Sequence, residues 1–449
     1  MQVVLISTYE LGRQPFGLAS PAAWLRQAGA EVRCLDLSRE PLDEEAVRDA
    51  GLLAVYVPMH TATRLAARLV PRLRRLNPGA RLCFYGLYAP MNESFLRSLG
   101  ADAILGGEFE PGLVSLYERL RRGQAGSQVE PVISLERLRF LTPDRNGLAP
   151  LGEYARLHTS AGPMVAGYTE ASRGCKHLCR HCPIVPVYQG RFRVVDREVV
   201  LEDIRRQVRL GARHITFGDP DFFNGPGHAL EIIRRMHQEF PDLTYDATIK
   251  ISHLLEQARH LATLRETGCL FVTSAVESID DGVLELLDKG HTRRDFLEVV
   301  ELCRRAGLAL SPTFVAFTPW TTMEGYRELL AMIEQLELVP NVAPIQLAIR
   351  LLIPNGSRLL DLGEVLALVG RFDEASLSYP WEHPDPAMDQ LCREVQALVK
   401  RIESERASRA EIFRRVWNVA YRGTASPGWQ DPDRPDRAAI PFLNEPWYC

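Results

Sequence analysis

The stretch Ser172-Arg173-Gly174-Cys175-Lys176-His177-Leu178-Cys179-Arg180-His181-Cys182 decides how the rest of the chain is interpreted. It carries three cysteines with C-x3-C-x2-C spacing, directly after the apolar segment 164–168, and no fourth cysteine lies nearby in the sequence. Three thiolates can hold a four-iron cluster at three corners and leave one iron open to a substrate. An open metal corner indicates chemistry, whereas a fully ligated site indicates structure or electron transfer.

A zinc site is the alternative for Cys175, Cys179 and Cys182. Structural zinc takes four protein ligands, commonly from two spaced pairs, so His177 or His181 would have to be the fourth ligand. Both histidines lie inside the short cysteine loop and would strain a tetrahedral site. The loop also follows the first strand of a predicted barrel, where catalytic loops are found. The sequence therefore favours the cluster.

The composition is that of an ordinary soluble globular protein. The 449 residues suffice for two or three domains, and 53 Lys and Arg against 57 Asp and Glu give a net charge of −4. This balance gives no reason to expect a nucleic acid or an anionic membrane as partner. No apolar run approaches a membrane span, and no basic region precedes the opening strand, so we expect no secretory signal. Outside the triplet the cysteines are scattered, which predicts free thiols and a reducing cytoplasm.

Residues 1–122 alternate short apolar strands with helices. The segment Leu53–Val57 is fully apolar, as is typical of a central strand in a parallel sheet. This pattern predicts a doubly wound, Rossmann-like α/β domain, whose ligands bind at the carboxyl ends of the strands. Glycines follow several of these strands. They could line a ligand site, or they could be needed only for turns in which φ is positive.

Three further segments follow along the chain. Residues 123–163 are rich in Gly and Pro and are predicted to be a linker. Residues 164–365 resume the strand–helix alternation with six strands, which predicts an open, partial (β/α)6 barrel with reactive groups on the loops after the strands. In residues 366–449, Leu391 and Val395 begin a helical apolar pattern, and a Pro- and Gly-rich tail follows, which we expect to pack against the fold.

The cysteine motif in this position resembles the radical SAM superfamily. The resemblance implies that Cys175, Cys179 and Cys182 bind a [4Fe-4S] cluster and that S-adenosylmethionine occupies the open iron. One electron from the cluster would then cleave the sulfonium and release a 5′-deoxyadenosyl radical that abstracts hydrogen from a substrate. It also implies a small-molecule or peptide substrate and an electron donor such as flavodoxin or ferredoxin.

The same resemblance assigns residues to S-adenosylmethionine. In this family the residue before the third cysteine lies near adenine, the loop after the second strand meets the methionine amino group, and the fourth strand ends with a polar group for the ribose. Asp219 is also a common turn residue, and Arg350, matched to the methionine carboxylate, suits a structural ion pair equally well. The matching positions in this chain are His181, Gly218, Asp219, Ser274, Glu277 and Arg350.

Residues 1–122 are similar to the cobalamin-binding domain that precedes many radical SAM barrels. The likeness is carried by the segments 15–19, 23–32, 59–63 and 106–110, and the implied cobalamin contacts are Thr61, Gly86, Gly106 and Gly107. The family's D-x-H-x-x-G is missing, so no histidine is offered to cobalt, and bulky residues follow Gly86 where paired glycines are expected. Two interpretations stay open: cobalamin without a protein ligand, or a domain that only buttresses the barrel.

The end of the chain is similar to that of a smaller group within the radical SAM superfamily. Asn444-Glu445-Pro446-Trp447-Tyr448-Cys449 resembles the run before the end of the CUAEP/CCAEP-tail radical SAM proteins, where Cys is followed by selenocysteine or cysteine and then Ala-Glu-Pro. Our hypothesis is that the product continues past Cys449 through a selenocysteine codon. The alternative is an authentic terminal cysteine. Under the hypothesis, Cys449 is a catalytic candidate as half of a redox or metal-binding pair.

The sequence thus predicts a Rossmann-like domain, a partial radical SAM barrel and a C-terminal helical region. The predicted chemistry is methyl transfer if cobalamin is bound and hydrogen abstraction if it is not. Two other classes stay open: a non-catalytic iron–sulfur electron carrier or redox sensor, and a zinc-stabilised scaffold.

Overall fold

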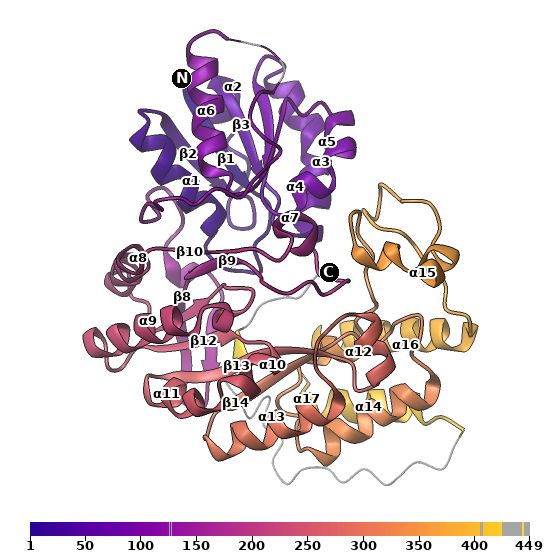
Figure 1. Ribbon diagram of the computed structural model, residues 1–449. Coiled ribbons are helices and arrows are strands. Elements are labelled where there is room, and N and C mark those ends of the chain that lie inside the picture. Colours follow the sequence, from indigo (N-terminus) through magenta and orange to yellow (C-terminus); the bar gives the residue numbers. More distant parts are fainter. Residues whose placement is uncertain (125, 127, 405–406, 424–441, 444–449) are drawn as a thin grey trace.

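The computed structural model describes the chain except for residues 125, 127, 405–406, 424–441 and 444–449. Two α/β units are stacked, with the N-terminal domain above the barrel in Figure 1. The prediction that concerns Cys449 lies outside the described residues, and of the tail between residue 424 and Cys449 only Phe442 and Leu443 are described.

The N-terminal domain is a six-stranded sheet with helices on both faces. Its strands are β1 (Gln2–Ser7), β2 (Glu31–Asp36), β3 (Ala50–Tyr56), β4 (Arg81–Tyr85), β5 (Ala103–Gly107) and β6 (Ile133–Ser134). Its helices are α1 (Phe16–Gln27), α2 (Glu44–Asp49), α3 (His60–Leu76), α4 (Tyr88–Met91), α5 (Glu93–Ser98) and α6 (Glu110–Arg121). The strand order is β2-β1-β3-β4-β5-β6, with every pairing parallel. The apolar strand β3 is central and buried, as its sequence predicts.

The second unit is a curled sheet in which five parallel strands carry the barrel. Its strands are β7 (Arg156–Thr159), β8 (Gly162–Thr169), β11 (His214–Phe217), β12 (Thr244–Thr248), β13 (Cys269–Glu277), β14 (Ala309–Phe314) and β15 (Phe442–Leu443). The order is β14-β13-β12-β11-β8-β7-β15, and the last two pairings are antiparallel. A short hairpin, β9 (Ser172–Gly174) and β10 (Phe192–Val194), follows β8 and opens the cysteine loop.

Helices connect and cover the barrel strands. They are α7 (Val185–Tyr188), α8 (Arg197–Arg209), α9 (Pro226–Glu239), α10 (Ile251–Glu256), α11 (Leu261–Glu266), α12 (Asp281–Leu286), α13 (Arg293–Arg305) and α14 (Met323–Gln335), followed by α15 (Gly363–Leu368), α16 (Pro386–Ser404) and α17 (Arg409–Ala420). The sequence explains several helix starts; for α13, Thr292 and Asp295 form a capping box. Apolar residues of α16 and α17 share one core with the barrel, so this helical region is part of that unit.

The predicted sixth barrel strand, Ile345–Ile353, is wrong. Residues Pro344–Leu347 form a 3-10 turn, and only the single bridge from Phe317 to Arg350 continues the sheet. The reason is that side-chain amides form hydrogen bonds with backbone groups at the exposed edge of β14, which a sixth strand would otherwise pair with. The Gln346 Oε1 accepts a hydrogen bond from the Phe314 N–H at 3.0 Å, and a second amide, from Asn341, donates to the Leu310 carbonyl at 2.7 Å.

The segment predicted to be a linker contributes to both sheets. Residues 123–163 supply β6 to the edge of the N-terminal sheet and β7 to the edge of the barrel sheet. Between these strands, the guanidinium of Arg145 forms a buried, bidentate ion pair with Asp203 of α8, at 2.9 and 3.0 Å. The segment is therefore a structural part of both units.

Arg173 joins the two units through a buried ion cluster. Its guanidinium is 3.2 Å from Glu108, 2.8 Å from Glu110 and 2.8 Å from Glu170. Two of these carboxylates follow β5 of the N-terminal domain, and Glu170 follows β8. The ring of Phe140 lies 5.0 Å from the guanidinium and helps to exclude water. Burial, and then the neighbouring Glu110, raise the pKa of Glu108 to about 7 against the opposing effect of Arg173.

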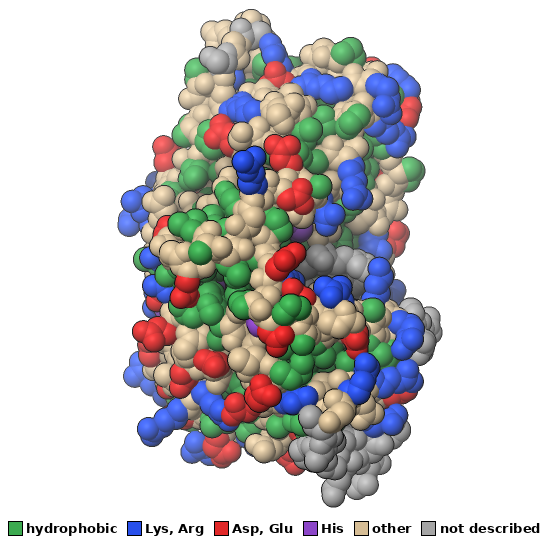
Figure 2. All heavy atoms as spheres, turned by 90° about the vertical axis from the view of Figure 1, so that its right-hand side faces the viewer, with side chains coloured by type: hydrophobic (Ala, Val, Ile, Leu, Met, Phe, Trp, Pro, Cys, Tyr) green, Lys and Arg blue, Asp and Glu red, His purple; other side chains and the backbone are tan. Residues whose placement is uncertain are grey.

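The surface has no comparable concentration of charge on the face shown in Figure 2, where basic and acidic side chains are interspersed. In the described part of the chain, no helix combines the length and the apolar character needed to span a membrane.

The substitution Arg173→Met tests the buried ion cluster. Removing one member of a buried ion pair typically costs about 3–5 kcal/mol, so we expect a large fall in the urea concentration at the unfolding midpoint. Because Glu108 has a raised pKa, protonation at low pH relieves the repulsion left behind, and the deficit should shrink from pH 8 to pH 5. The control is Arg122→Met, whose exposed partner is Glu118. An Arg173→Met midpoint equal to that of wild type would contradict this account.

Candidate active site

The cysteine loop lies at the carboxyl edge of the barrel sheet, directly after β8 and β9. Gly174 begins the loop with a φ of +74°, and a Cβ there would lie 2.5 Å from the Arg191 carbonyl oxygen, so only glycine fits. All three thiols are free; Cys179 is buried, and Cys175 and Cys182 are partly exposed. Burial raises the pKa of Cys182 to about 12, so this thiol needs a metal to become a thiolate.

The spacing of the sulfur atoms favours a cluster over one zinc ion. Four ligands on a single zinc, with Zn–S bonds of about 2.3 Å, would bring the sulfur atoms within about 4 Å of one another. Among the described residues, one group of three potential ligands lies within 4.8 Å, and it does not include the cysteines. Cys175, Cys179 and Cys182 therefore do not form such a close group among the described residues, as is expected where each thiolate binds a different iron atom.

Asp219 fastens the start of the loop to the end of β11. One carboxylate oxygen accepts a hydrogen bond from the Ser172 hydroxyl at 2.5 Å, and the other accepts from the Ala171 N–H at 2.9 Å. Burial raises the pKa of Asp219 to about 7, even though these hydrogen bonds oppose the shift. The preceding Gly218 packs against β8, because a Cβ there would lie 1.8 Å from the Tyr168 hydroxyl. The resemblance assigns Gly218 and Asp219 to the methionine amino group. In the structure both residues already contact other parts of this chain.

A second residue of this loop, Asn224, supports the cysteines from the same side. Its side-chain oxygen accepts a hydrogen bond from the Lys176 N–H at 3.2 Å, and the Cys175 sulfur lies 3.8 Å from that oxygen. The sequence did not single out Asn224, although its position shortly after a barrel strand is the signal that could have found it.

His181 and Glu277, which the resemblance assigns to S-adenosylmethionine, lie close together in the structure. The His181 Nε2 lies 3.1 Å from the Glu277 carboxylate, and the Lys289 ammonium lies 3.5 Å from the same oxygen. Burial alone would raise the pKa of Glu277, but Lys289 and then His181 outweigh it and lower the pKa to about 2. Ser274 on the same strand is fully buried, and its hydroxyl has no hydrogen-bond partner in the described part of the chain. The end of β13 therefore offers an ionised carboxylate and a free hydroxyl.

The other loop histidine, His177, contacts the ends of β11 and β12. Its Nε2 lies 3.2 Å from the Nε2 of His253, and the His253 Nδ1 lies 2.6 Å from the Asp221 carboxylate. His253 and Asp221 are almost fully buried. The sequence did not indicate His253 as part of the site, because nothing local shows which strand ends face one another.

Arg350 lies in a structural ion pair, the alternative that the sequence left open. Its guanidinium is 2.6 Å from the Asp389 carboxylate, donates to the Trp381 carbonyl at 2.7 Å, and stacks over the Trp381 ring at 3.5 Å from the ring centre. The structural ion pair is therefore the alternative that this structure contains, with helix α16 supplying the partner, and the assignment of Arg350 to the methionine carboxylate stays a prediction.

The glycines matched to cobalamin are packed against the protein itself. A Cβ on Gly86, which has a φ of +113°, would lie 3.1 Å from the Val57 carbonyl oxygen. A Cβ on Gly106 would lie 2.1 Å from the Pro90 ring, and one on Gly107 would lie 2.2 Å from the Ser134 carbonyl oxygen. Thr61 is half-buried in the first turn of α3. Gly86 and Gly107 follow the turn interpretation, because both have a positive φ, and Gly106 is explained by the close approach of the Pro90 ring.

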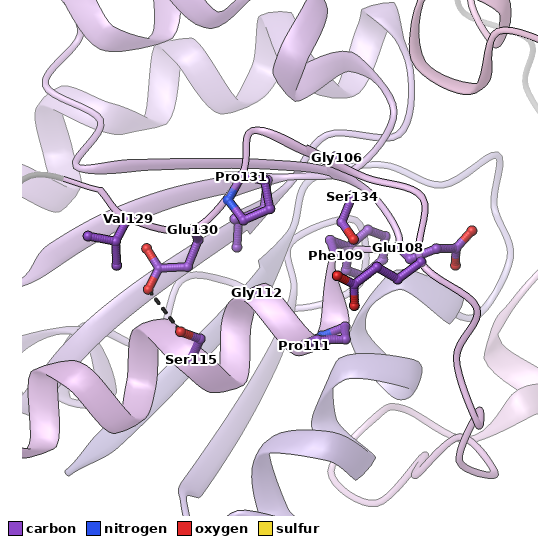
Figure 3. Close-up of a pocket in the computed structure, with 12 residues that line it drawn as sticks. Gly106, Glu108, Phe109, Pro111, Gly112, Ser115, Val129, Glu130, Pro131 and Ser134 are labelled. Carbon is purple, nitrogen blue, oxygen red and sulfur yellow. Dashed lines mark hydrogen bonds between the residues drawn. The ribbon is translucent and has the colours of Figure 1, made fainter.

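A cavity of about 230 Å³ lies beside the same strand end (Figure 3). Glu108 and Phe109 line it on one side, and the Ser115 hydroxyl donates to Glu130 at 3.2 Å on the other. All its lining residues fall within 105–136, so it belongs to the N-terminal domain alone. It is smaller than the pockets of about 300–1,000 Å³ that hold drug-sized ligands, and much too small for a corrinoid.

A parallel half-barrel with three free thiols at its carboxyl edge defines a class of cluster-dependent enzymes. Comparison with known proteins agrees: residues 169–333 match the Radical SAM superfamily. The chain therefore contains a radical SAM domain. It is 26% identical over 327 residues to the hopanoid C-3 methylase of Methylococcus capsulatus, a match that covers 68% of this chain and 62% of that protein. It is also 26% identical over 254 residues to the tRNA-2-methylthio-N(6)-dimethylallyladenosine synthase of Prosthecochloris aestuarii, covering 54% of this chain and 53% of the synthase.

Solved structures share the fold across both units. The cobalamin-dependent S-adenosylmethionine radical enzyme OxsB, with aqua-cobalamin and S-adenosylmethionine bound, matches with a TM-score of 0.70 and 14% identity over 89% of this chain and 66% of OxsB. The radical S-adenosylmethionine methyltransferase TsrM from Kitasatospora setae, with tryptophan and a SAM analogue bound, matches with a TM-score of 0.65 and 16% identity over 88% of this chain and 89% of TsrM. The chain thus has the two-unit fold of these enzymes.

Two substitutions of Asp219 separate its structural role from a role in binding. Asp219→Ala leaves the buried Ala171 N–H unsatisfied, at a cost of about 1–3 kcal/mol, so we expect the iron and sulfide content of the reconstituted protein to fall several-fold. Asp219→Asn can still hydrogen-bond both loop groups and should keep the wild-type iron content and the wild-type affinity for S-adenosylmethionine. The exposed Asp242→Ala is the control. If Asp219→Asn retains iron but loses affinity, the carboxylate contacts the ligand and the structural assignment fails.

Proposed function

We propose that this protein is a radical SAM enzyme that holds a [4Fe-4S] cluster on Cys175, Cys179 and Cys182 and S-adenosylmethionine at the open iron. The observation that carries the proposal is the set of three free, separated thiols, framed by polar side chains from the ends of β11, β12 and β13. When bound and reduced, the cluster supplies the electron that splits S-adenosylmethionine into methionine and a 5′-deoxyadenosyl radical.

The chain's own residues bind, orient and exclude water. Asp219 holds the cysteine loop against β11. The ionised carboxylate of Glu277 accepts hydrogen bonds from the ribose hydroxyls, and Lys289 keeps it ionised. His181 lies against Glu277 and borders the adenosine. The substrate is a small molecule or peptide, and the electron comes from a donor such as flavodoxin or ferredoxin.

Methyl transfer with cobalamin as the methyl carrier is the second candidate. It is favoured by the likeness of the whole two-unit fold to OxsB and TsrM and by the similarity to a hopanoid methylase. One observation speaks against it. The glycines matched to cobalamin contact other residues of the chain closely, so these contacts explain the glycines without a ligand: Gly86, Gly106 and Gly107. No step of the mechanism above depends on cobalamin.

The substitution Cys179→Ala tests the first proposal. Without one of its three cysteine ligands the cluster is lost. Anaerobic assays with dithionite should therefore show no 5′-deoxyadenosine from S-adenosylmethionine, whereas wild type produces it. The control is Cys83→Ala, a buried cysteine of the N-terminal sheet, which should retain cleavage. Retained cleavage in Cys179→Ala would rule out the assignment. A brown wild-type protein that binds the cluster without cleavage would indicate an electron carrier or sensor, and a colourless protein with one zinc would indicate a scaffold.

The optical spectrum of the anaerobic protein tests the second candidate. After incubation with hydroxocobalamin and gel filtration, a methyltransferase should retain about one corrinoid per chain. Its spectrum should lack a histidine ligand to cobalt, because the loop directly after β1, residues 8–15, contains no histidine. A protein that keeps the cluster and cleaves S-adenosylmethionine, yet elutes without corrinoid, would exclude methyl transfer through cobalamin and leave the first proposal standing.

A further inference from the structure

Three side chains with metal-binding atoms converge beside the cysteine loop. His177 belongs to the loop itself, Asp221 follows β11, and His253 lies in α10 after β12. One ligand atom from each side chain lies within 4.8 Å of the others. In the part of the chain that the structure describes, no second group of three histidine, cysteine or acidic side chains is this close. Two imidazoles and one carboxylate are a donor set that binds divalent transition-metal ions.

The Asp221 carboxylate is held so that one of its two oxygens is free. The Oδ1 atom accepts hydrogen bonds from the backbone N–H of Phe223 at 3.2 Å and from that of Lys250 at 3.4 Å. The Oδ2 atom is buried and has no hydrogen-bond partner among the described residues. A buried carboxylate oxygen without a donor or a cation is unfavourable, because burial removes its hydration and nothing replaces it. The free oxygen of Asp221 therefore indicates a missing ligand.

The distances from His253 to its two neighbours also favour a bound ion. Its Nδ1 lies 2.6 Å from the Asp221 Oδ2, yet neither atom takes part in a hydrogen bond within the described chain. Two electronegative atoms this close repel each other unless an aligned proton or a cation lies between them. The Nε2 of the same ring lies 3.2 Å from the His177 Nε2. A cation bound to these side chains would remove the repulsion.

A buried His–Asp hydrogen bond that only orients His253 is the competing interpretation. It requires the Nδ1–H to point at the carboxylate, and the two groups are not aligned in this way. The spacing fits an ion better, since bonds of about 2.0–2.1 Å to one metal place neighbouring ligand atoms about 3–3.4 Å apart. The two Nε2 atoms, 3.2 Å apart, lie in this range. The His177 Nε2 and the Asp221 Oδ2, at 3.8 Å, need only a small side-chain rotation to reach it.

Lys250 limits how tightly such a site can hold a dication. It lies between β12 and α10, is only 9% exposed, and places its ammonium 3.7 Å from where a Cβ on Gly290 would be. A positive charge in these buried surroundings weakens the binding of a second cation. We therefore expect an ion that exchanges with the solution, in contrast to the tightly held zinc of a structural site.

We propose that His177, Asp221 and His253 bind one divalent transition-metal ion, such as zinc, in addition to the cluster. The inference goes beyond the proposed function and does not depend on it, because none of the three ligands is a cluster cysteine. Three protein ligands leave at least one coordination position open. An oxygen or nitrogen atom of a substrate can bind there and be polarised by the ion. The site would therefore hold a substrate with a metal-ligating group at the carboxyl edge of the barrel.

Equilibrium dialysis of the anaerobically reconstituted protein against zinc, followed by elemental analysis, tests the site. The variants are His253→Ala and Asp221→Asn, and the control is His260→Ala, a histidine shortly after α10 that lies outside the group. Wild type and the control should bind about one zinc per chain, and both variants should bind zinc on the order of 10-fold or more weakly while keeping their iron. A wild type that binds no zinc, or variants that bind it as wild type does, would overturn the proposal.

X-ray absorption at the zinc edge of wild type decides the question even if a variant fails to fold or loses its iron. The expected spectrum has nitrogen and oxygen neighbours at about 2.0–2.1 Å and no sulfur at about 2.3 Å. Sulfur neighbours would place the zinc on the cysteines and overturn the proposal. Release of the zinc by saturating S-adenosylmethionine would assign the three residues to that ligand and overturn it as well. None of these measurements requires cleavage, so an inactive wild type would count against the proposed function alone.

Discussion

The buried guanidinium of Arg173 is the interaction on which the arrangement of the two units depends. It lies between Glu108 and Glu110 of one unit and Glu170 of the other, and it directly precedes the cysteine loop. Removing this one positive charge would leave three carboxylates without their counter-charge, at a typical cost of about 3–5 kcal/mol for a buried pair. The position of the loop is therefore fixed relative to the N-terminal domain, while Asp219 fixes it from the barrel side.

The contacts of Arg173 and Asp219 explain how a cysteine loop with little regular secondary structure can be held in one position. The two histidines between them face different strand ends, His177 toward His253 and His181 toward Glu277. Side-chain contacts thus hold the loop around the barrel mouth, and its three thiols do not form a close single-ion ligand group in the described part of the chain. Binding groups held in this way need little reorganisation when a ligand enters.

The strand–helix alternation and the cysteine motif could be predicted from the sequence because both are local patterns. The alternation of residues 1–122 and the helical spacing after residue 386 are confirmed. What could not be predicted were pairings between distant segments: Asp219 with Ser172, Arg350 with Asp389, and the Gln346 amide that replaces a sixth strand. The sequence shows which side chains follow a strand, but not which distant group already satisfies them.

The central claim is that the three thiols present an iron with an open position to S-adenosylmethionine. Electron paramagnetic resonance of the dithionite-reduced, reconstituted protein tests it most directly, because a ligand on the open iron changes the g-values of the cluster. We expect the spectrum of a single four-iron cluster that shifts when S-adenosylmethionine is added and does not shift in Cys179→Ala, which lacks the cluster. A wild-type cluster spectrum that is unchanged by saturating S-adenosylmethionine would contradict the account.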